Sequence, residues 1–188
     1  MKQLILEHIE RNQETIESLK KHILNIEKVI KTCSEAIDNG KKLILFGNGG
    51  SASDSQHIAA ELVGRFRLER RGLPAISIAT DTSALTAISN DYGYEFVFER
   101  QIEAIANTGD VLIGISTSGN SENVYRGLSI GSAKGCQLVG FLGGNGGKIK
   151  NICDIEITIS SNETARIQEC HILIGHIICD AIESNLNL

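Results

Sequence analysis

Short apolar runs and amphipathic stretches alternate along most of the chain. Apolar runs at 42–46, 75–79, 111–115, 137–142 and 155–159 are typical of strands that are buried on both faces of a sheet. Helical spacing of apolar residues follows position 54 and recurs at 81–89, 94–106, 121–134 and 163–184. This order predicts an α/β fold, a doubly wound, flavodoxin-like sheet of five parallel strands, in which ligands bind beyond the carboxyl ends of the strands.

The first 39 residues form a long helical region of their own. They contain no glycine or proline and many Glu and Lys residues, and Asn39-Gly40 ends the pattern. Seven apolar residues alternate three and four positions apart, as in a heptad seam: Ile16, Leu19, Ile23, Ile26, Ile30, Cys33 and Ile37. Such a seam packs either on its own sheet or against another subunit. Its narrowness favours the second, so we expect one domain, with an N-terminal helical oligomerisation arm at 1–39 and an α/β core at 40–188.

A glycine-rich loop separates the first apolar run from the helical pattern that follows it. Free backbone N–H groups at a helix N-terminus bind anions, so the loop predicts a phosphate site. Gly47, Gly49 and Ala52 also fit a dinucleotide-binding pattern, but Asp81 comes too late to serve as its acidic residue. No Lys-Ser or Lys-Thr pair follows the glycines, which excludes a Walker loop.

The next helix carries candidate reactive groups. Ser53 and Gln56 fit a capping box, which predicts a helix that starts at position 54. Four-residue spacing then places His57 and Glu61 on one face, with Arg65 one turn further along. Because the other stripe is apolar, this polar face should line a cleft or a subunit interface. The apolar stripe consists of Ile58, Leu62 and Phe66.

A second loop between a strand and a helix is rich in hydroxyl groups. Its six residues are Ser116, Thr117, Ser118, Gly119, Asn120 and Ser121. Any single serine here could serve only as a helix cap. Four hydroxyls together with backbone N–H groups can satisfy the oxygens of a phosphate without a lysine, which favours phosphate binding.

The last helical stretch mixes polar groups with apolar ones. A lone histidine on an apolar helix is usually a core residue, and that alternative applies to His176. Glu169 and His176, seven residues apart, share a face, whereas Gln168 is offset from His176 by less than a quarter turn. Spacing alone therefore leaves open which of the two polar residues accompanies His176.

Composition narrows the class of partner. A net charge of -5 gives no general attraction for nucleic acid or anionic membranes, and no apolar run approaches the roughly 18 residues of a membrane span. A small polar metabolite is the expected partner. The five cysteines form no CxxC pair and no signal peptide precedes them, so we expect reduced thiols in a cytoplasmic protein.

Taken together, these motifs resemble the sugar isomerase (SIS) domain family over nearly the whole chain. The motifs are the two loops, Gln-His-Ile-Ala-Ala-Glu-Leu at 56–62, Asn90-Asp91, and Thr-Ala-Arg-Ile-Gln-Glu at 164–169 with His176. The members that the chain resembles convert sedoheptulose 7-phosphate to D-glycero-D-manno-heptose 7-phosphate, the entry step to bacterial ADP-heptose and GDP-heptose precursors for lipopolysaccharide and other surface glycans. They are tetramers with active sites at subunit interfaces.

The resemblance also implies a set of site residues. Phosphate contacts map onto Ser51, Ser116, Thr117, Ser118 and Ser121. Sugar contacts map onto Asn48, Gly49, Gly50, Asn90, Asp91 and Gln168. Members that hold zinc use ligands that correspond to His57, Glu61, Gln168 and His176. Arg65 could contact substrate or only pair with an acidic residue.

An aldose–ketose isomerase needs a base, an enediol stabiliser and an acid for the oxygens. We assign Glu61 as the base and His176 as its acid/base partner. A zinc ion would polarise the enediol oxygens, although a carboxylate that binds metal is not a free base. Two alternatives remain: a non-catalytic relative that binds the replication initiator, which lacks both of these residues, and a sensor or isomerase of another sugar phosphate.

Overall fold

The structure is a computed structural model and describes residues 1–185 of the chain. Five parallel strands form one sheet in the order β2-β1-β3-β4-β5. The strands are β1 (Leu43–Gly47), β2 (Ala75–Ser77), β3 (Val111–Ser116), β4 (Gln137–Gly143) and β5 (Ile155–Ile159). This order is that of the flavodoxin-like doubly wound sheet, which confirms the predicted fold class.

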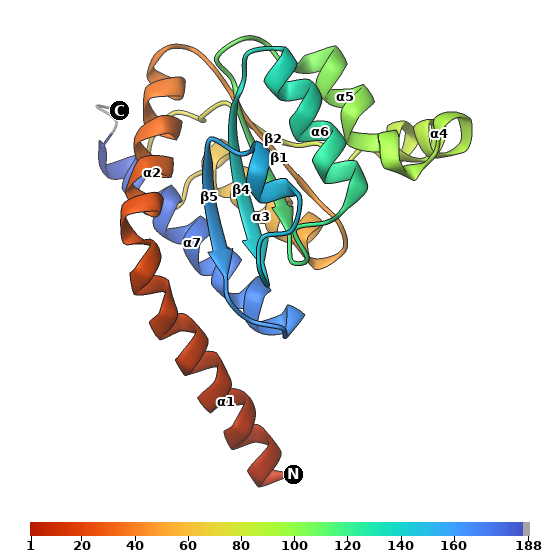
Figure 1. The fold of residues 1–188 in the computed structure, drawn as a ribbon. Coiled ribbons are helices and arrows are strands. Elements are labelled where there is room, and N and C mark those ends of the chain that lie inside the picture. The colour runs from red at the N-terminus through yellow and green to blue at the C-terminus, as the bar shows by residue number, and fades with distance from the viewer. Residues whose placement is uncertain (186–188) are drawn as a thin grey trace.

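The described residues also form seven α-helices and three short 3-10 helices, which precede, connect and follow the strands (Figure 1). The α-helices are α1 (Lys2–Glu17), α2 (Ile23–Asp38), α3 (Gly50–Val63), α4 (Thr82–Tyr92), α5 (Val97–Ile105), α6 (Glu122–Ala133) and α7 (Thr164–Asn185). The 3-10 helices are η1 (Ser18–His22), η2 (Tyr94–Phe96) and η3 (Ile149–Ile152). None of these helices is both long and apolar enough to cross a membrane.

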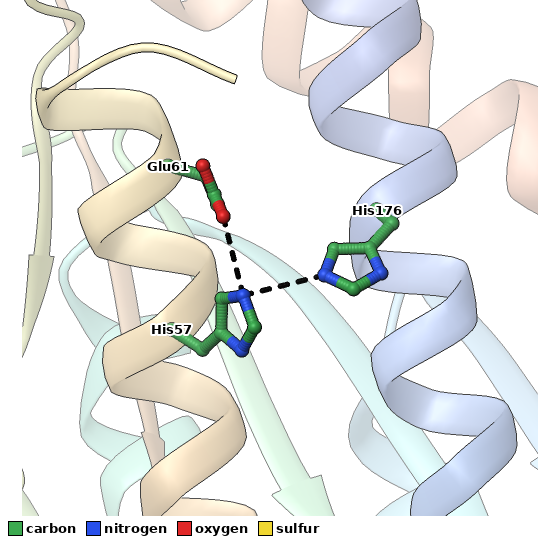
Figure 2. Close-up of side chains that lie close together, drawn as sticks. All are labelled: His57, Glu61 and His176. Carbon is green, nitrogen blue, oxygen red and sulfur yellow. Dashed lines mark hydrogen bonds and ion pairs between the residues drawn. The ribbon is translucent and has the colours of Figure 1, made fainter. Parts of the chain in front are cut away.

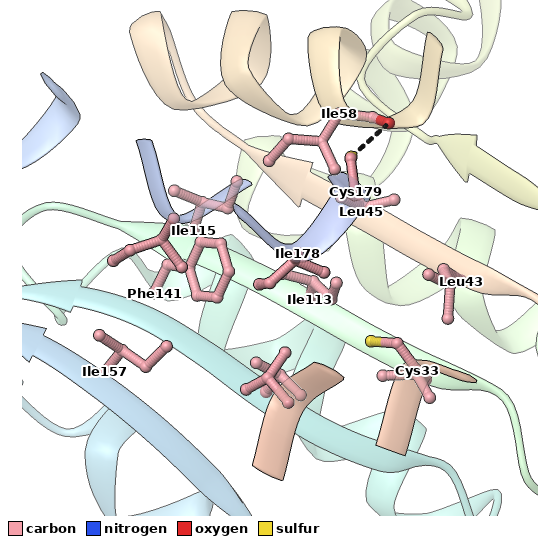
Figure 3. Close-up of a cluster of buried hydrophobic side chains, with 14 of the residues drawn as sticks. Cys33, Leu43, Leu45, Ile58, Ile113, Ile115, Phe141, Ile157, Ile178 and Cys179 are labelled. Carbon is pink, nitrogen blue, oxygen red and sulfur yellow. Dashed lines mark hydrogen bonds between the residues drawn. The ribbon is translucent and has the colours of Figure 1, made fainter. Parts of the chain in front are cut away.

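The sheet has an apolar core on each face, because successive residues of a strand point to opposite sides. Leu43 and Leu45 pack toward α2, α3 and α7, and Figure 3 shows part of this cluster. Ile44 and Phe46 pack on the other side, toward α5 and α6. The two-sided burial explains why the strands read as nearly continuous apolar runs.

The N-terminal region is not one continuous helix as predicted. The 3-10 helix η1 separates α1 from α2, and the two parts differ in burial. Along α2, most of the heptad seam is buried in the chain's own core, as at Ile26, Cys33 and Ile37. Helix α1 extends away from the body, and none of its residues is buried (Figure 1). The role of residues 1–39 as an oligomerisation arm stays a prediction.

Helix α3 begins earlier than the capping box predicts. It starts at Gly50, because Gly49 makes the turn out of β1 with a positive φ of 57°. Such a turn is strained for other residues. The Ser53 hydroxyl donates to the carbonyl oxygen of Gly49 over 3.5 Å, so Ser53 does not cap a helix that starts at position 54. Strand β2 is also shorter than predicted and ends at Ser77.

A buried histidine joins α7 to the end of β4. His171 is fully buried, and its Nε2 lies 3.0 Å from the carbonyl oxygen of Leu142. Burial lowers the pKa of His171 to about 4, so the ring is neutral near pH 7. The contact ties the part of α7 that follows Gln168 to the carboxyl edge of the sheet.

Candidate active site

Three polar side chains meet between α3 and α7 (Figure 2). His57 Nε2 lies 3.2 Å from Glu61 Oε1 and 3.3 Å from His176 Nε2. The first contact follows from four-residue spacing on α3, as predicted. The second requires the two helices to lie close together, and Gly175 permits this because a Cβ there would come within 2.6 Å of Ile58. The structure therefore brings His57, Glu61 and His176 into one cluster.

The three side chains of the cluster are close enough together to hold a metal ion. One ligand atom from each of the three residues lies within 4.8 Å of the others. A tetrahedral zinc site with ligands at about 2.1 Å has ligand atoms roughly 3.4 Å apart, close to the two contacts at His57. A single proton on His57 Nε2 cannot fully satisfy both a carboxylate and a second imidazole nitrogen. Two histidines and a carboxylate are also a donor set that catalytic zinc uses.

Gln168 does not join this cluster in the single chain. It lies eight residues before His176, roughly 12 Å along the helix axis. Its amide contacts Gly50 at the start of α3, where a Cβ would overlap it. Of the four candidate metal ligands, the structure brings three together and places the fourth beside the glycine loop.

The two predicted phosphate loops are neighbours at the carboxyl edge of the sheet. They follow β1 and β3, which lie next to each other in the sheet and lead into α3 and α6 on opposite faces. This is the switch point at which such sheets bind ligands. A Cβ on Gly47 would lie 2.8 Å from the carbonyl oxygen of Ile115, so the first loop passes directly beside β3.

The hydroxyl groups of the second loop gather around one residue. Ser116 is buried, and its Oγ lies 3.0 Å from Ser121 Oγ and 3.5 Å from Ser118 Oγ. Thr117 is half-buried, and Ser51 of the first loop is buried. The loop thus concentrates donors at the N-terminus of α6, where an anion is stabilised.

Asn90 and Asp91 lie apart from the cluster. Both are exposed in the last turn of α4, and Asn90 Nδ2 donates to Asp91 Oδ1 over 2.9 Å. Helix α4 projects from the body (Figure 1), and none of its residues is buried. These two candidates therefore stand on a surface element of the single chain.

The prediction that Arg65 and Phe66 continue the stripes of α3 is wrong, because the helix ends at Val63. Arg65 is exposed, and its Nε lies 3.7 Å from Oε2 of Glu69. Phe66 still packs against the core, as predicted, although it does so from outside the helix. It also stacks on the ring of His176, with centroids 5.6 Å apart and planes at 22°.

A buried ion pair fixes the segment that follows α3. Glu183 accepts backbone N–H groups of Phe66, Arg67 and Leu68 over 2.7 to 2.9 Å, and pairs with Arg70 at 2.8 Å. Both charged side chains are 1% exposed. These backbone N–H groups and the Arg70 guanidinium lower the pKa of Glu183 to about 2. Arg70 also donates to the carbonyl of Glu61, so the pair joins the cluster's carboxylate helix to α7.

Sequence reasoning missed Asp54, which lies one turn before His57. Its Oδ2 is buried without a hydrogen-bond partner within the described residues. Burial raises the pKa of Asp54 to about 6, and the neighbouring His57 limits the rise. The three-residue spacing to His57 is the signal in the sequence that could have found it.

Comparisons with known proteins place this architecture among SIS domains. The sequence model of the SIS domain matches residues 7–143. Phosphoheptose isomerase of a Nitratiruptor species is 55% identical over 96% of this chain and 95% of that protein. The phosphoheptose isomerase of Aliarcobacter butzleri is 52% identical over the full length of both chains.

Solved structures agree in fold and length. Phosphoheptose isomerase GmhA from Neisseria gonorrhoeae matches with a TM-score of 0.92 and 37% identity, over 97% of this chain and 98% of that one. A phosphoheptose isomerase from Francisella tularensis matches with a TM-score of 0.94 and 32% identity over the same shares. The similarity thus covers nearly all of each chain.

We predict that the buried Glu183 stabilises the fold. Glu183→Gln should lower the free energy of unfolding by about 3 kcal/mol at pH 7, because Arg70 would remain buried without its counter-charge. The pKa of Glu183 is about 2 in the folded protein against 4.5 as its ordinary value, so its contribution is complete above pH 4.5 and is lost as the pH falls toward 2. Urea unfolding at several pH values measures both effects.

The control for this prediction is Asp180→Asn. Asp180 pairs with Arg67 at 2.9 Å, but its side chain is 43% exposed. Exposed pairs contribute less than about 1 kcal/mol, so this variant should unfold nearly like the wild type. Equal losses in the two variants would contradict the role given to burial of Glu183.

Proposed function

The chain belongs to the SIS domain family, in the group of the phosphoheptose isomerases, and from this premise we propose its reaction and mechanism. It is an aldose–ketose isomerase that converts sedoheptulose 7-phosphate to D-glycero-D-manno-heptose 7-phosphate through an enediol. This is the first step toward the nucleotide-activated heptoses of bacterial surface glycans. The observation that carries the proposal is the cluster of His57, Glu61 and His176, because an isomerase needs a base and an acid together.

The phosphate of the substrate binds at the two loops. Ser51 lies in the first turn of α3 and Ser121 precedes α6, and both supply neutral donors. Ser116, the last residue of β3, adds its hydroxyl beside that of Ser121. Thr117 and Ser118 complete the set on the second loop. The sugar chain then extends along Asn48, Gly49 and Gly50 toward α7, where Gln168 lies against the glycine loop.

Glu61 acts as the base in the proposed mechanism. It removes a proton from C1 of the open-chain ketose, and the electron pair moves to form the enediol. His176 donates a proton to the O2 oxygen and accepts the one at O1. Returning the carbon-bound proton to C2 from Glu61 gives the aldose. Phe66 stacks on His176 and limits the orientations that its ring can adopt.

Zinc is the cofactor that we propose for this site, with His57, Glu61 and His176 as ligands. Because Gln168 of the same chain lies roughly 12 Å from His176 along α7, the candidate for the fourth position is Gln168 from a neighbouring subunit. The 3.2 and 3.3 Å contacts at His57 support it. When bound, zinc polarises the two oxygens of the enediol. With zinc bound, neither Glu61 nor His176 could bind the metal and exchange a proton through the same atom, so the proton transfers would use the other oxygen of the Glu61 carboxylate and the other ring nitrogen of His176.

We also propose a homotetramer with active sites at subunit interfaces. The cluster lies at the surface of the single chain, since the His57 side chain is 48% exposed. Val63, Leu68 and Ile177, which lie near the cluster residues in sequence, are 40 to 52% exposed. Asn90, Asp91 and Arg65 would reach substrate from such an assembly. The protein should act in the cytoplasm, where its five free cysteines stay reduced.

Two other functions fit less of the site. The non-catalytic relative that binds the replication initiator lacks the carboxylate and histidine that correspond to Glu61 and His176, and this chain has both. A sensor or an isomerase of a shorter ketose phosphate would use the same phosphate loops. Only a comparison of substrates separates that alternative from the heptose reaction.

We predict that purified protein with added zinc converts sedoheptulose 7-phosphate to the aldose 7-phosphate, detected by chromatography. Turnover should exceed that of five- and six-carbon ketose phosphates. Glu61→Gln should reduce turnover by on the order of a thousandfold or more, because the base is lost while the fold remains. Glu103→Gln, which changes an exposed carboxylate on α5, is the matched control. No product from any of these sugars would remove the enzyme assignment, and a preference for a shorter sugar would change the substrate.

We predict one zinc ion per chain, measured by calorimetry on chelator-treated protein and by elemental analysis after dialysis. His57→Ala should weaken zinc binding by at least a hundredfold, because it removes one of three ligands. His8→Ala, on exposed α1, should bind zinc like the wild type. Equal zinc binding by both variants would remove His57 from the metal site.

We predict a mass in light scattering of four times the 20.3 kDa chain at micromolar concentration. The double variant Ile5→Glu, Ile9→Glu should give a smaller species, because it places charges on the exposed apolar side of α1. Circular dichroism should show the same helix content in both. A wild-type monomer would contradict the tetramer.

A further inference from the structure

Three residues from separate parts of the chain form a hydrogen-bonded network at the carboxyl ends of β1 and β3. Asn48 follows β1, Asn123 lies in the first turn of α6 after β3, and Tyr94 begins η2 after α4. The two asparagine amides bond to each other in both directions, over 2.9 and 2.8 Å. The Tyr94 hydroxyl donates to Asn48 Oδ1 over 3.0 Å.

A backbone group sets the orientation of the whole network. The N–H of Val124, in the first turn of α6, donates to Asn123 Oδ1 over 2.9 Å. A backbone N–H is always a donor, so the oxygen of Asn123 must face it. The same oxygen accepts from Asn48 Nδ2, which leaves Asn123 Nδ2 to donate to Asn48 Oδ1. Turning the Asn48 amide around would place oxygen against oxygen.

This arrangement uses every acceptor position of Asn48. Its Oδ1 has two lone pairs, which receive one hydrogen from Asn123 and one from Tyr94. Its Nδ2 carries two hydrogens, of which one goes to Asn123. The remaining N–H is available to a ligand, so Asn48 meets that ligand as a donor only.

We propose that Tyr94 is a positioning residue, which acts with Asn123 to hold the Asn48 amide as a donor to an acceptor oxygen of the sugar chain. The inference rests on the proposed isomerase function and adds to it the direction of one substrate contact. Asn123 is 4% exposed and forms the fixed base of the network, whereas Tyr94 is 55% exposed and closes it from the solvent side. Without the Tyr94 hydroxyl, one lone pair of Asn48 loses its partner and the amide is held from one side only.

A donor at this place suits the part of the sugar chain beside the phosphate loops. A hydroxyl oxygen there can accept a hydrogen bond while its own proton goes to another group. A freely turning amide would offer its oxygen to the substrate part of the time, and that oxygen would repel the lone pairs of the hydroxyl oxygen. The fixed amide therefore improves binding of the sugar phosphate away from the reacting carbons, and the effect belongs to KM, with kcat nearly unchanged.

The test compares Tyr94→Phe with Tyr92→Phe. Both changes remove one exposed hydroxyl and keep the ring, but Tyr92 packs its ring on Arg100 instead of bonding to Asn48. Tyr94→Phe should raise KM for sedoheptulose 7-phosphate on the order of fivefold, the factor that one neutral hydrogen bond provides, with kcat within about twofold. Tyr92→Phe should match the wild type. Equal kinetics for the two variants would overturn the proposal.

Binding measurements separate this inference from the proposed function. In a Glu61→Gln background, calorimetry should show sedoheptulose 7-phosphate binding weakened by Tyr94→Phe by the same factor, while inorganic phosphate binds unchanged. Equal weakening for inorganic phosphate would overturn the proposal, because it would show a disturbed phosphate site. If the parent protein neither binds nor converts the sugar, the proposed function fails instead.

A double-mutant cycle tests whether Tyr94 acts through Asn48. In an Asn48→Ala background, Tyr94→Phe should change KM by less than a factor of about 1.5, because the amide that it orients is gone. An undiminished fivefold effect in that background would show a separate role for Tyr94 and would contradict the inference.

Discussion

The close approach of α3 and α7 is the constraint on which the site depends. Gly175 leaves room for Ile58 at the contact, and His57 and His176 face each other beside it. A side chain at position 175 would separate the helices and with them the two histidines. Since α3 follows β1 and α7 ends the described chain, this one contact joins residues more than a hundred positions apart into a single cluster.

The ion pair of Glu183 and Arg70 maintains this contact from the far end of the helices. Burying two charges is costly, and only a complete set of partners compensates for the cost. Glu183 finds them in three backbone N–H groups and a guanidinium, and Arg70 donates to carbonyls where α3 ends. The result fixes the segment after α3, so that Phe66 lies on His176. Helix α7 thus carries both Glu183 of the buried charge pair and His176 of the candidate site.

Much of the fold and the composition of the site could be predicted from the sequence, because both depend on local spacing. The alternating apolar runs predicted the parallel sheet, and the four-residue spacing predicted the contact of His57 with Glu61. The predicted start of α3 was wrong, because the conformation of Gly49 starts the helix before the capping pattern at Ser53. Contacts between distant segments, such as that of Asn123 with Asn48, have no periodic signal and could not be predicted.

In the single chain, Gln168 lies apart from the cluster of His57, Glu61 and His176. Geometry on one helix separates it from His176 by eight residues, and its amide lies on Gly50, at the phosphate side of α3. Helices α3 and α7 therefore meet at two places, Gln168 against Gly50 near the loops and His176 against His57 further along. A sugar phosphate held by its phosphate at the loops would extend along both helices, with Gln168 at its middle and the cluster at its carbonyl end. The middle of the sugar carries only hydroxyl groups, and in this arrangement it would face the neutral amide of Gln168.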